Sequence, residues 1–271
     1  MIKTHRIFRL KKSPVICHVP HASIRIPRAY RSDYLLPKEN LEVEAISMAD
    51  LYADELFSDL LDEFGAITAT LSRLVVDMER LADDKEEPME KRAGMGVLYT
   101  RTQNGELLRD ISPVKRIKYM MLYENYHDAF AKLVSECLDK FDKCLILDCH
   151  TFPSRRRQYE EDQRMPRPDV CIGTDNYHTP VLLKQSLTKS FAAQGYTVKN
   201  NSPYSGTIVP LQYLEKDSRV QSIMIEINRS LYMNERTFKK RKDFERVSRR
   251  FCEIIKGAIS ACGPGTKPIN A

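Results

Sequence analysis

Short apolar runs alternate with longer amphipathic stretches along most of the chain. Helical periodicity, in which apolar side chains recur every three or four positions, predicts helices at 39–63, 180–194 and 236–261, and one long helix or two at 113–141. Apolar or β-branched runs predict buried strands at 14–18, 66–70, 144–150, 169–173, 196–200 and 222–227, with a further strand or strand end at 72–80. Strands that alternate with helices in this way are typical of an α/β domain with helices on both faces of the sheet.

Two long polar segments interrupt this alternation. Residues 81–111 contain an acidic run and two close glycines, and residues 151–168 are rich in Arg, Glu and Pro. A loop as long as 81–111 inside a compact domain usually carries function, so it is a candidate lid over a ligand site. We expect one domain over residues 1–271, with its core at 14–261 and a frayed tail at 263–271.

Composition excludes several classes of protein. Hydrophobic residues make up 42% and charged residues 30% of the 271 positions, as in an ordinary soluble globular chain. No apolar run approaches the roughly 18 residues that span a bilayer, and no signal-peptide core follows the basic amino terminus, so we expect a cytoplasmic protein. The seven cysteines are scattered without C-x-x-C spacing, which favours reduced core thiols over a disulfide framework or a zinc finger.

The formal net charge of +6 is modest, but it includes two basic runs, at 155–157 and 239–242. Clustered Lys and Arg can contact nucleic-acid phosphates. Acidic residues follow both runs closely, and no recognisable nucleic-acid-binding motif accompanies them. The pattern therefore favours solvated loops or helix faces, and we expect neither a nucleic-acid nor a membrane partner.

Potential metal ligands occur at the ends of three predicted strands. Asp148 and His150 end one apolar run, His21 follows a second, and Glu226 lies within a third. Open α/β sheets keep their ligand sites at the carboxyl ends of the strands, and catalytic zinc usually takes three protein ligands and a water. We therefore predict that these strand ends meet around one metal ion, with His21 and His150 as the natural pair of ligands. The alternative for each histidine is a structural role in the core.

Glu226 has two interpretations. If both faces of its strand are covered, burial raises the pKa of its carboxyl group, which suits a general base that acts on water. If side chains simply alternate between a core face and a solvent face, Ile223, Ile225 and Ile227 share the core face and Glu226 points to solvent. The pattern alone does not decide between them.

Arg73 and Arg80 flank an apolar run that ends at Asp77. An arginine at a strand end can bind a carboxylate through two hydrogen bonds or stabilise a developing negative charge on an oxygen. The alternative is an ion pair with Asp77 or with the acidic residues 83–87.

An ordered set of short motifs resembles the N-formylglutamate amidohydrolase family, from about residue 14 to residue 234. The motifs are Val19-Pro-His21-Ala-Ser23, Ser72-Arg-Leu-Val-Val-Asp-Met-Glu-Arg80, Tyr126-His127, Asp148-Cys-His150, Tyr204-Ser-Gly206 and Ile225-Glu-Ile-Asn228. No single motif is specific, whereas their order and spacing are. The resemblance implies a three-layer αβα sandwich with a mixed, mostly parallel central sheet, like that of zinc carboxypeptidases and aspartoacylases. It also implies metal-dependent hydrolysis of N-formyl-L-glutamate to formate and glutamate. We expect the protein to be a monomer or a small homo-oligomer.

By position in these motifs, the resemblance implies that His21 and His150 are ligands of zinc or another divalent transition metal. The glutamate that follows the first histidine by three residues in the carboxypeptidase relatives is replaced here by Ile24, which cannot bind metal. Asp50, in a D-x-L-Y-like segment, takes the place of third ligand, with an exposed helix position as its alternative. Zinc would lower the pKa of a bound water.

The resemblance also assigns roles around the substrate. Glu226 would take the proton from water and return it to the leaving amine, while Arg73 or Arg80 stabilises the oxyanion and Arg80 contacts the substrate carboxylate. Tyr204 and His127 would be secondary pocket residues, with core positions as their alternative.

The chain has Glu79 where the relatives' D-x-N-R motif has Asn, and the added negative charge beside Arg80 would weaken binding of an acidic substrate. Two rival functions therefore remain. One is another N-acyl amino acid hydrolase or carboxypeptidase on this scaffold, and the other is a non-catalytic protein that binds anions or nucleic acid.

Overall fold

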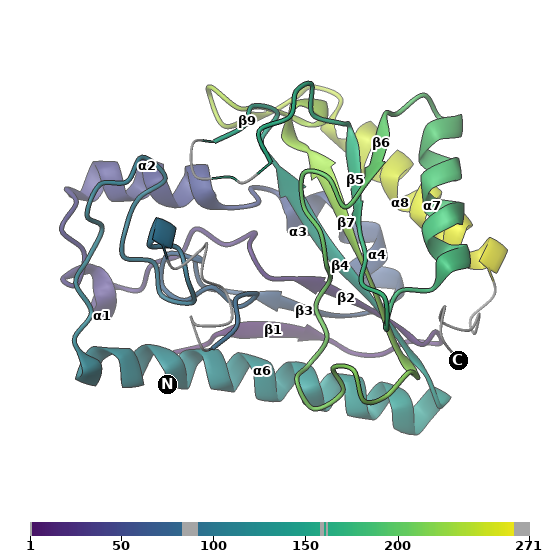
Figure 1. Ribbon diagram of the computed structural model, residues 1–271, viewed down its shortest axis with the longest axis horizontal. Coiled ribbons are helices and arrows are strands. Elements are labelled where there is room, and N and C mark those ends of the chain that lie inside the picture. Colours follow the sequence, from purple (N-terminus) through teal and green to yellow (C-terminus); the bar gives the residue numbers. More distant parts are fainter. Residues whose placement is uncertain (1, 83–91, 158–159, 161, 263–271) are drawn as a thin grey trace.

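A mixed seven-stranded sheet lies at the centre of the computed structural model, which describes residues 2–82, 92–157, 160 and 162–262 (Figure 1). The strand order is β1-β3-β2-β4-β7-β5-β6, and only the pairs β1–β3 and β5–β7 are antiparallel. The strands are β1 (His5–Phe8), β2 (Val15–Val19), β3 (Gly65–Ala69), β4 (Cys144–Phe152), β5 (Val170–Gly173), β6 (Val198–Asn200) and β7 (Val220–Asn228). This confirms the mixed, mostly parallel sheet; the tail at 263–271, predicted to fray, lies outside the described residues.

Helices cover both faces of the sheet. They are α1 (Arg28–Arg31), α2 (Lys38–Met48), α3 (Ala53–Leu56), α4 (Ser58–Glu63), α6 (Pro113–Phe141), α7 (Val181–Ala193) and α8 (Phe244–Cys262). The long helix α6 packs on one face, whereas α3, α4, α7 and α8 pack on the other (Figure 1). The three-layer α/β/α architecture expected from the sequence is therefore confirmed. In the part of the chain that the structure describes, no helix is long and apolar enough to cross a bilayer.

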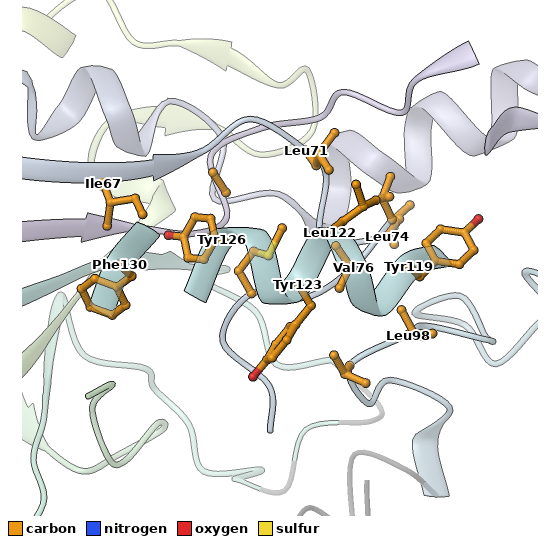
Figure 2. Close-up of a cluster of buried hydrophobic side chains, with 14 of the residues drawn as sticks. Ile67, Leu71, Leu74, Val76, Leu98, Tyr119, Leu122, Tyr123, Tyr126 and Phe130 are labelled. Atoms are coloured by element: carbon orange, nitrogen blue, oxygen red, sulfur yellow. The ribbon is translucent and has the colours of Figure 1, made fainter. Parts of the chain in front are cut away.

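Successive side chains of each strand point to opposite faces of the sheet and so contribute to two separate hydrophobic cores. On β4, Ile146 packs with the α6 layer and Leu147 with the opposite layer. Figure 2 shows the α6 side of the sheet, where Tyr126 and Phe130 lie beside Ile67 of β3. Each such side chain, fully removed from water, stabilises the fold by about 1.5–3 kcal/mol.

Local signals explain where α6 begins and ends. The Ser112 side chain accepts a hydrogen bond from the Lys115 N–H, and Pro113 occupies the first turn, where its missing N–H costs nothing. Asp142 adopts a left-handed conformation just past the last turn, with φ of 56°. Helical structure at 113–141 is confirmed, and of the two possibilities the structure has one long helix.

The strand β4 is longer than the sequence indicated. We expected the chain to leave the sheet after His150, because Thr151-Phe-Pro-Ser154 is a poor strand sequence. Instead, Thr151 and Phe152 continue the parallel pairing with β7, opposite Ile227 and Asn228, and the strand ends only at Phe152, immediately before Pro153. His150 therefore lies within a strand, opposite Glu226 of β7 and two residues past the last pair with β2, which is His18 with Asp148.

The helix predicted at 39–63 is broken into α2, α3 and α4. The break at residues 49–52 contains Asp50, whose backbone N–H donates to the His21 carbonyl oxygen at 2.9 Å. Tyr52 follows in a left-handed conformation with φ of 68°. This contact with the segment after β2 overrides the helical periodicity, so placing Asp50 inside a helix was wrong.

Three further expectations need correction. Residues 72–80 form an irregular segment rather than a strand, because the Asp77 N–H donates to the Val97 carbonyl at 2.9 Å instead of joining the sheet. The last helix starts at Phe244, and the preceding residues form a small hairpin, β8 (Met233–Asn234) and β9 (Lys239–Lys240), after the short η1 helix (Arg229–Leu231). The edge strand β1 was not predicted, since its alternating polar residues gave no apolar run.

Candidate active site

A cavity of about 350 Å³ opens at the carboxyl edge of the parallel strands. His21 follows β2 by two residues, while His150 and Glu226 lie opposite each other on the adjacent strands β4 and β7. The structure thus brings the three predicted strand ends together at one place. Titratable and charged side chains that line the cavity are His21, Asp50, Arg73, Glu79, Arg80, Tyr99, His150, Arg157, Tyr204, Glu226 and Arg229.

His21 is oriented by a carboxylate behind it. Its Nε2 lies 2.7 Å from Asp77 Oδ1, and its buried Nδ1 has no hydrogen-bond partner in the part of the chain that the structure describes. Burial lowers the pKa of His21, which favours the neutral ring. If Nε2–H donates to Asp77, Nδ1 keeps its lone pair, and a buried nitrogen of this kind is what a metal ligand supplies.

His150 sits among three carboxylates. Its Nδ1 is 3.0 Å from Asp50 Oδ2, and its Nε2 is 2.8 Å from Asp148 Oδ1 and 3.0 Å from Glu79 Oε1. Burial by itself lowers the pKa of His150, but the charges of Glu79 and Asp148 raise it well above its usual value. The surroundings therefore favour a positive charge at this position, whether a proton on the ring or a metal ion beside it.

Glu79 supplies the carboxylate that joins the two histidines. Its Oε2 is 3.6 Å from His21 Nδ1, and it belongs with His21 and His150 to a group whose ligand atoms all lie within 4.8 Å of one another. Burial, with the charge of Asp148, raises the pKa of Glu79. Glu79 was not predicted as a site residue, because from the sequence it was only a departure from the D-x-N-R motif.

Asp50 lies beside the same histidines but faces other partners. Its Oδ2 is 3.0 Å from His150 Nδ1 and 3.9 Å from His21 Nδ1, and its Oδ1 accepts from Arg229 Nη2 at 3.1 Å. It is 3% exposed, so the alternative of an exposed helix residue does not hold. Asp50 belongs to neither of the ligand groups found among the described residues.

A second group consists of His18, Asp148 and His150. Asp148 Oδ1 lies 2.8 Å from both His18 Nδ1 and His150 Nε2. His18 also stacks on the Phe130 ring of α6, with ring centroids 4.8 Å apart. Asp148 and His18 therefore connect the Nε2 side of the His150 ring to helix α6.

The position of Glu226 agrees in part with both interpretations of its strand, burial of the carboxylate and simple alternation of the side chains. Ile223, Ile225 and Ile227 do pack together in the opposite core, as alternation predicts. The other face, however, opens into the cavity rather than into bulk solvent, and Glu226 is only 7% exposed. Burial raises the pKa of Glu226 to about 8, and its Oε2 has no hydrogen-bond partner among the described residues.

Four arginines of the described residues line the cavity, and two of them, Arg73 and Arg80, were predicted from the sequence. Arg73 donates from Nε and Nη2 to Asp77 Oδ2 at 3.0 and 2.8 Å, which is the ion pair considered as its alternative role. Arg80 lines the cavity next to Glu79. Arg229 and Arg157 were missed, although Arg229 directly follows the strand that carries Glu226, a position that points to the same sheet edge.

The two predicted secondary pocket residues have different positions. Tyr204 lines the cavity, and its hydroxyl donates to Glu160. His127 does not line it: the ring lies on α6 against Tyr123, with centroids 4.0 Å apart, and burial lowers its pKa to about 4. The position of His127 therefore agrees with the alternative of a structural residue rather than with a pocket residue.

Part of the predicted loop 81–111 also reaches the cavity. Residues 83–91 lie outside the described residues, but Leu81 and Tyr99 contribute to the wall. The Tyr99 hydroxyl donates to Asp77 Oδ2 at 3.0 Å, behind His21.

Comparison with known proteins agrees with the motif order. A model of the family described as N-formylglutamate amidohydrolase matches residues 13–233. A curated protein named N-formylglutamate deformylase, from Pseudomonas aeruginosa, is 26% identical over 266 residues, which is 94% of this chain and 96% of that protein.

Solved structures show the same fold. The N-formylglutamate amidohydrolase of Ralstonia eutropha superposes with a TM-score of 0.81 at 21% identity, covering 95% of this chain and 98% of that one. A gene product of Agrobacterium tumefaciens superposes with a TM-score of 0.66 at 18% identity, covering 96% of each chain. The resemblance drawn from the sequence motifs is confirmed, and the chain belongs to the N-formylglutamate amidohydrolase family.

Proposed function

We propose that this protein hydrolyses the formyl amide of N-formyl-L-glutamate, or of a closely similar N-acyl acidic amino acid, and depends on a divalent metal ion. The observation that carries the proposal is the convergence of His21 Nδ1, Glu79 and the His150 imidazole within 4.8 Å, in a cavity that Glu226 also lines. The name of the curated relative supports the same substrate.

The residues present suit a metal ion such as zinc. Among the described residues, His21 offers a buried Nδ1 without a hydrogen-bond partner, and the charges of Glu79 and Asp148 beside His150 favour a positive charge there. His21, His150 and Glu79 would hold the ion, and Asp50, predicted as the third ligand, is better placed to fix the His150 ring through Nδ1. When bound, such an ion supplies a Lewis acid that polarises the formyl carbonyl and acidifies a nearby water.

Glu226 is the proposed proton carrier. Its free Oε2 accepts a proton from the attacking water and later gives it to the amine nitrogen of the departing amino acid. A pKa raised to about 8 by burial is close to neutral pH, where one group can serve as base and then as acid.

Arg80 is the proposed partner of the substrate α-carboxylate. That carboxylate is one carbon away from the amide nitrogen, so its partner must lie close to the hydrolytic groups. Arg80 meets this requirement because it lines the cavity directly beside Glu79. Binding there would fix the formyl group against His21 and His150.

One observation favours a second candidate. The carboxylate of Glu79 lies where an acidic substrate must approach, and a less acidic N-acyl amino acid would meet less repulsion there. Hydrolysis of such a substrate by the same groups is the alternative.

A substrate panel tests both candidates. Protein loaded with Zn²⁺, Mn²⁺ or Co²⁺ is assayed for formate or acetate release from N-formyl-L-glutamate, N-formyl-L-glutamine and N-acetyl-L-glutamate. The proposal predicts the highest kcat/KM for N-formyl-L-glutamate. A higher value for N-formyl-L-glutamine would favour the alternative. A higher value for N-acetyl-L-glutamate would keep the acidic amino acid and change the acyl group, and no hydrolysis of any of the three would remove both candidates.

A further inference from the structure

The arginines of the cavity differ in how their charge is compensated. Arg73 pairs with Asp77, and Arg229 pairs with Asp50 Oδ1 at 3.1 Å. Arg157 donates from its guanidinium only to uncharged acceptors, namely Gln103 Oε1, Ser47 O at 2.6 Å and Met48 Sδ at 3.1 Å. Among the described residues, no carboxylate forms an ion pair with the Arg157 side chain.

The acceptors of Arg157 are themselves held in place. The Gln103 N–H donates to Glu44 Oε1 at 2.7 Å, and its Nε2 donates to Glu44 Oε2 at 3.0 Å and to Ser47 Oγ at 2.9 Å. These bonds turn Gln103 Oε1 toward Arg157. The guanidinium is therefore oriented before any ligand arrives, which lowers the entropy cost of binding one.

A second guanidinium increases the local positive charge. Arg229 Nη1 donates to the Ser47 carbonyl at 3.0 Å, and this is the same oxygen that accepts from Arg157. Two guanidinium groups that share one carbonyl oxygen make this part of the cavity favourable for an anion. Both arginines line the cavity, and a carboxylate matches the planar guanidinium through two hydrogen bonds.

We propose that Arg157 binds the side-chain carboxylate of the substrate and makes the enzyme select acidic amino acids. The inference rests on the proposed function, since it names how that substrate is recognised. Among the described residues, hydrogen bonds link Arg157 to His150 through the Ser47 carbonyl, Arg229 and Asp50, which places Arg157 at the outer end of this series of contacts. This position suits the side-chain carboxylate of the substrate, which lies farther from the amide than the α-carboxylate does.

The basic run at 155–157 also contains a suitable control residue for substitutions of Arg157. Arg155 and Arg156 are exposed and do not line the cavity, and Arg156 donates to the Gln163 carbonyl at 2.9 Å. Arg157 alone of the three turns inward. Arg155→Gln removes the same charge from the same segment without touching the cavity.

The kinetic test compares metal-loaded wild type with Arg157→Gln, Arg157→Lys and Arg155→Gln. The substrates are N-formyl-L-glutamate and N-formyl-L-glutamine, which differ in charge but hardly in shape. Loss of a charged hydrogen-bond pair predicts that Arg157→Gln raises KM for the glutamate substrate by about 10- to 100-fold and changes kcat little. KM for the glutamine substrate should change less than about threefold, Arg157→Lys should fall in between, and Arg155→Gln should match wild type.

Two kinetic results would overturn the inference. One is an unchanged preference for the glutamate substrate in folded Arg157→Gln and Arg157→Lys. The other is an equal rise of KM for both substrates, which would indicate a structural role.

A binding measurement keeps the inference separate from the proposed function. Calorimetric titration with L-glutamate and L-glutamine needs no turnover. Weaker binding of glutamate alone by Arg157→Gln supports the carboxylate site even if wild type releases no formate. Equal glutamate affinity of wild type and variant contradicts it even if wild type is a fast deformylase.

Discussion

His150 and Glu226 occupy paired positions on the adjacent parallel strands β4 and β7, so their side chains leave the same face of the sheet. The His150 imidazole contacts three carboxylates, whereas Glu226 Oε2 has no hydrogen-bond partner within the described part of the chain. This pairing puts a position that attracts a cation next to a carboxyl group that can exchange a proton. The register of two strands thus determines the distance between the proposed metal and the proposed base.

Replacement of Glu226 separates proton transfer from metal binding. Glu226→Gln keeps the shape of the side chain but removes the group that accepts the proton, so kcat should fall about 10²- to 10⁴-fold. Metal content by elemental analysis should stay at the wild-type level, because Glu226 is not a proposed ligand. A kcat within a few-fold of wild type would end the role of Glu226 as the base.

The third metal ligand is tested by comparing Glu79→Gln with Asp50→Asn. Loss of a ligand should weaken zinc affinity more than loss of a residue that only orients His150, for which about 10- to 100-fold is typical. We therefore expect the larger loss for Glu79→Gln in competition titrations with a chromogenic chelator. The opposite order would restore Asp50 as the ligand predicted from the sequence.

The pKa of His127 gives a prediction about stability. Burial lowers this pKa to about 4 in the folded protein, whereas the unfolded chain takes up the proton near pH 6.5. The unfolded state therefore binds more protons between these values, so the stabilisation is complete above pH 6.5 and is lost as the pH falls toward 4. Between pH 7 and pH 5 the loss from this one group is about 2 kcal/mol.

Urea unfolding of metal-free protein at the two pH values measures this effect. His127→Gln should show a smaller decrease of the unfolding free energy between pH 7 and pH 5 than wild type does, while His18 and His21 contribute equally to both proteins. The same decrease in both proteins would show that His127 is not held neutral by burial.

Much of the fold could be predicted because it follows from local patterns. The apolar runs of β2, β4 and β7 and the periodicity of α6 are strong signals that tertiary contacts reinforce. The errors occur where a distant contact overrides the local pattern. The bond between the Asp50 N–H and His21 O breaks a helix, and pairing with β7 extends β4 past a poor strand sequence.

The candidate site was predictable only in part for a related reason. His21, His150 and Glu226 could be found because each is a polar residue at or near the end of an apolar run. Glu79 could not, because its irregular segment was interpreted as a strand and its carboxylate as a hindrance to the substrate. Arg157 was hidden in a basic run beside acidic residues, where only the fold shows which of three arginines turns inward.

The central claim, metal-dependent hydrolysis of a formyl amide, is tested most directly by removing and restoring the metal. Formate release from N-formyl-L-glutamate is followed for purified protein, for protein stripped with a chelator, and for stripped protein titrated with Zn²⁺ while bound metal is counted by elemental analysis. The account predicts loss of turnover on stripping and a linear return that saturates near one ion per chain. Full turnover by protein that contains no metal would contradict it.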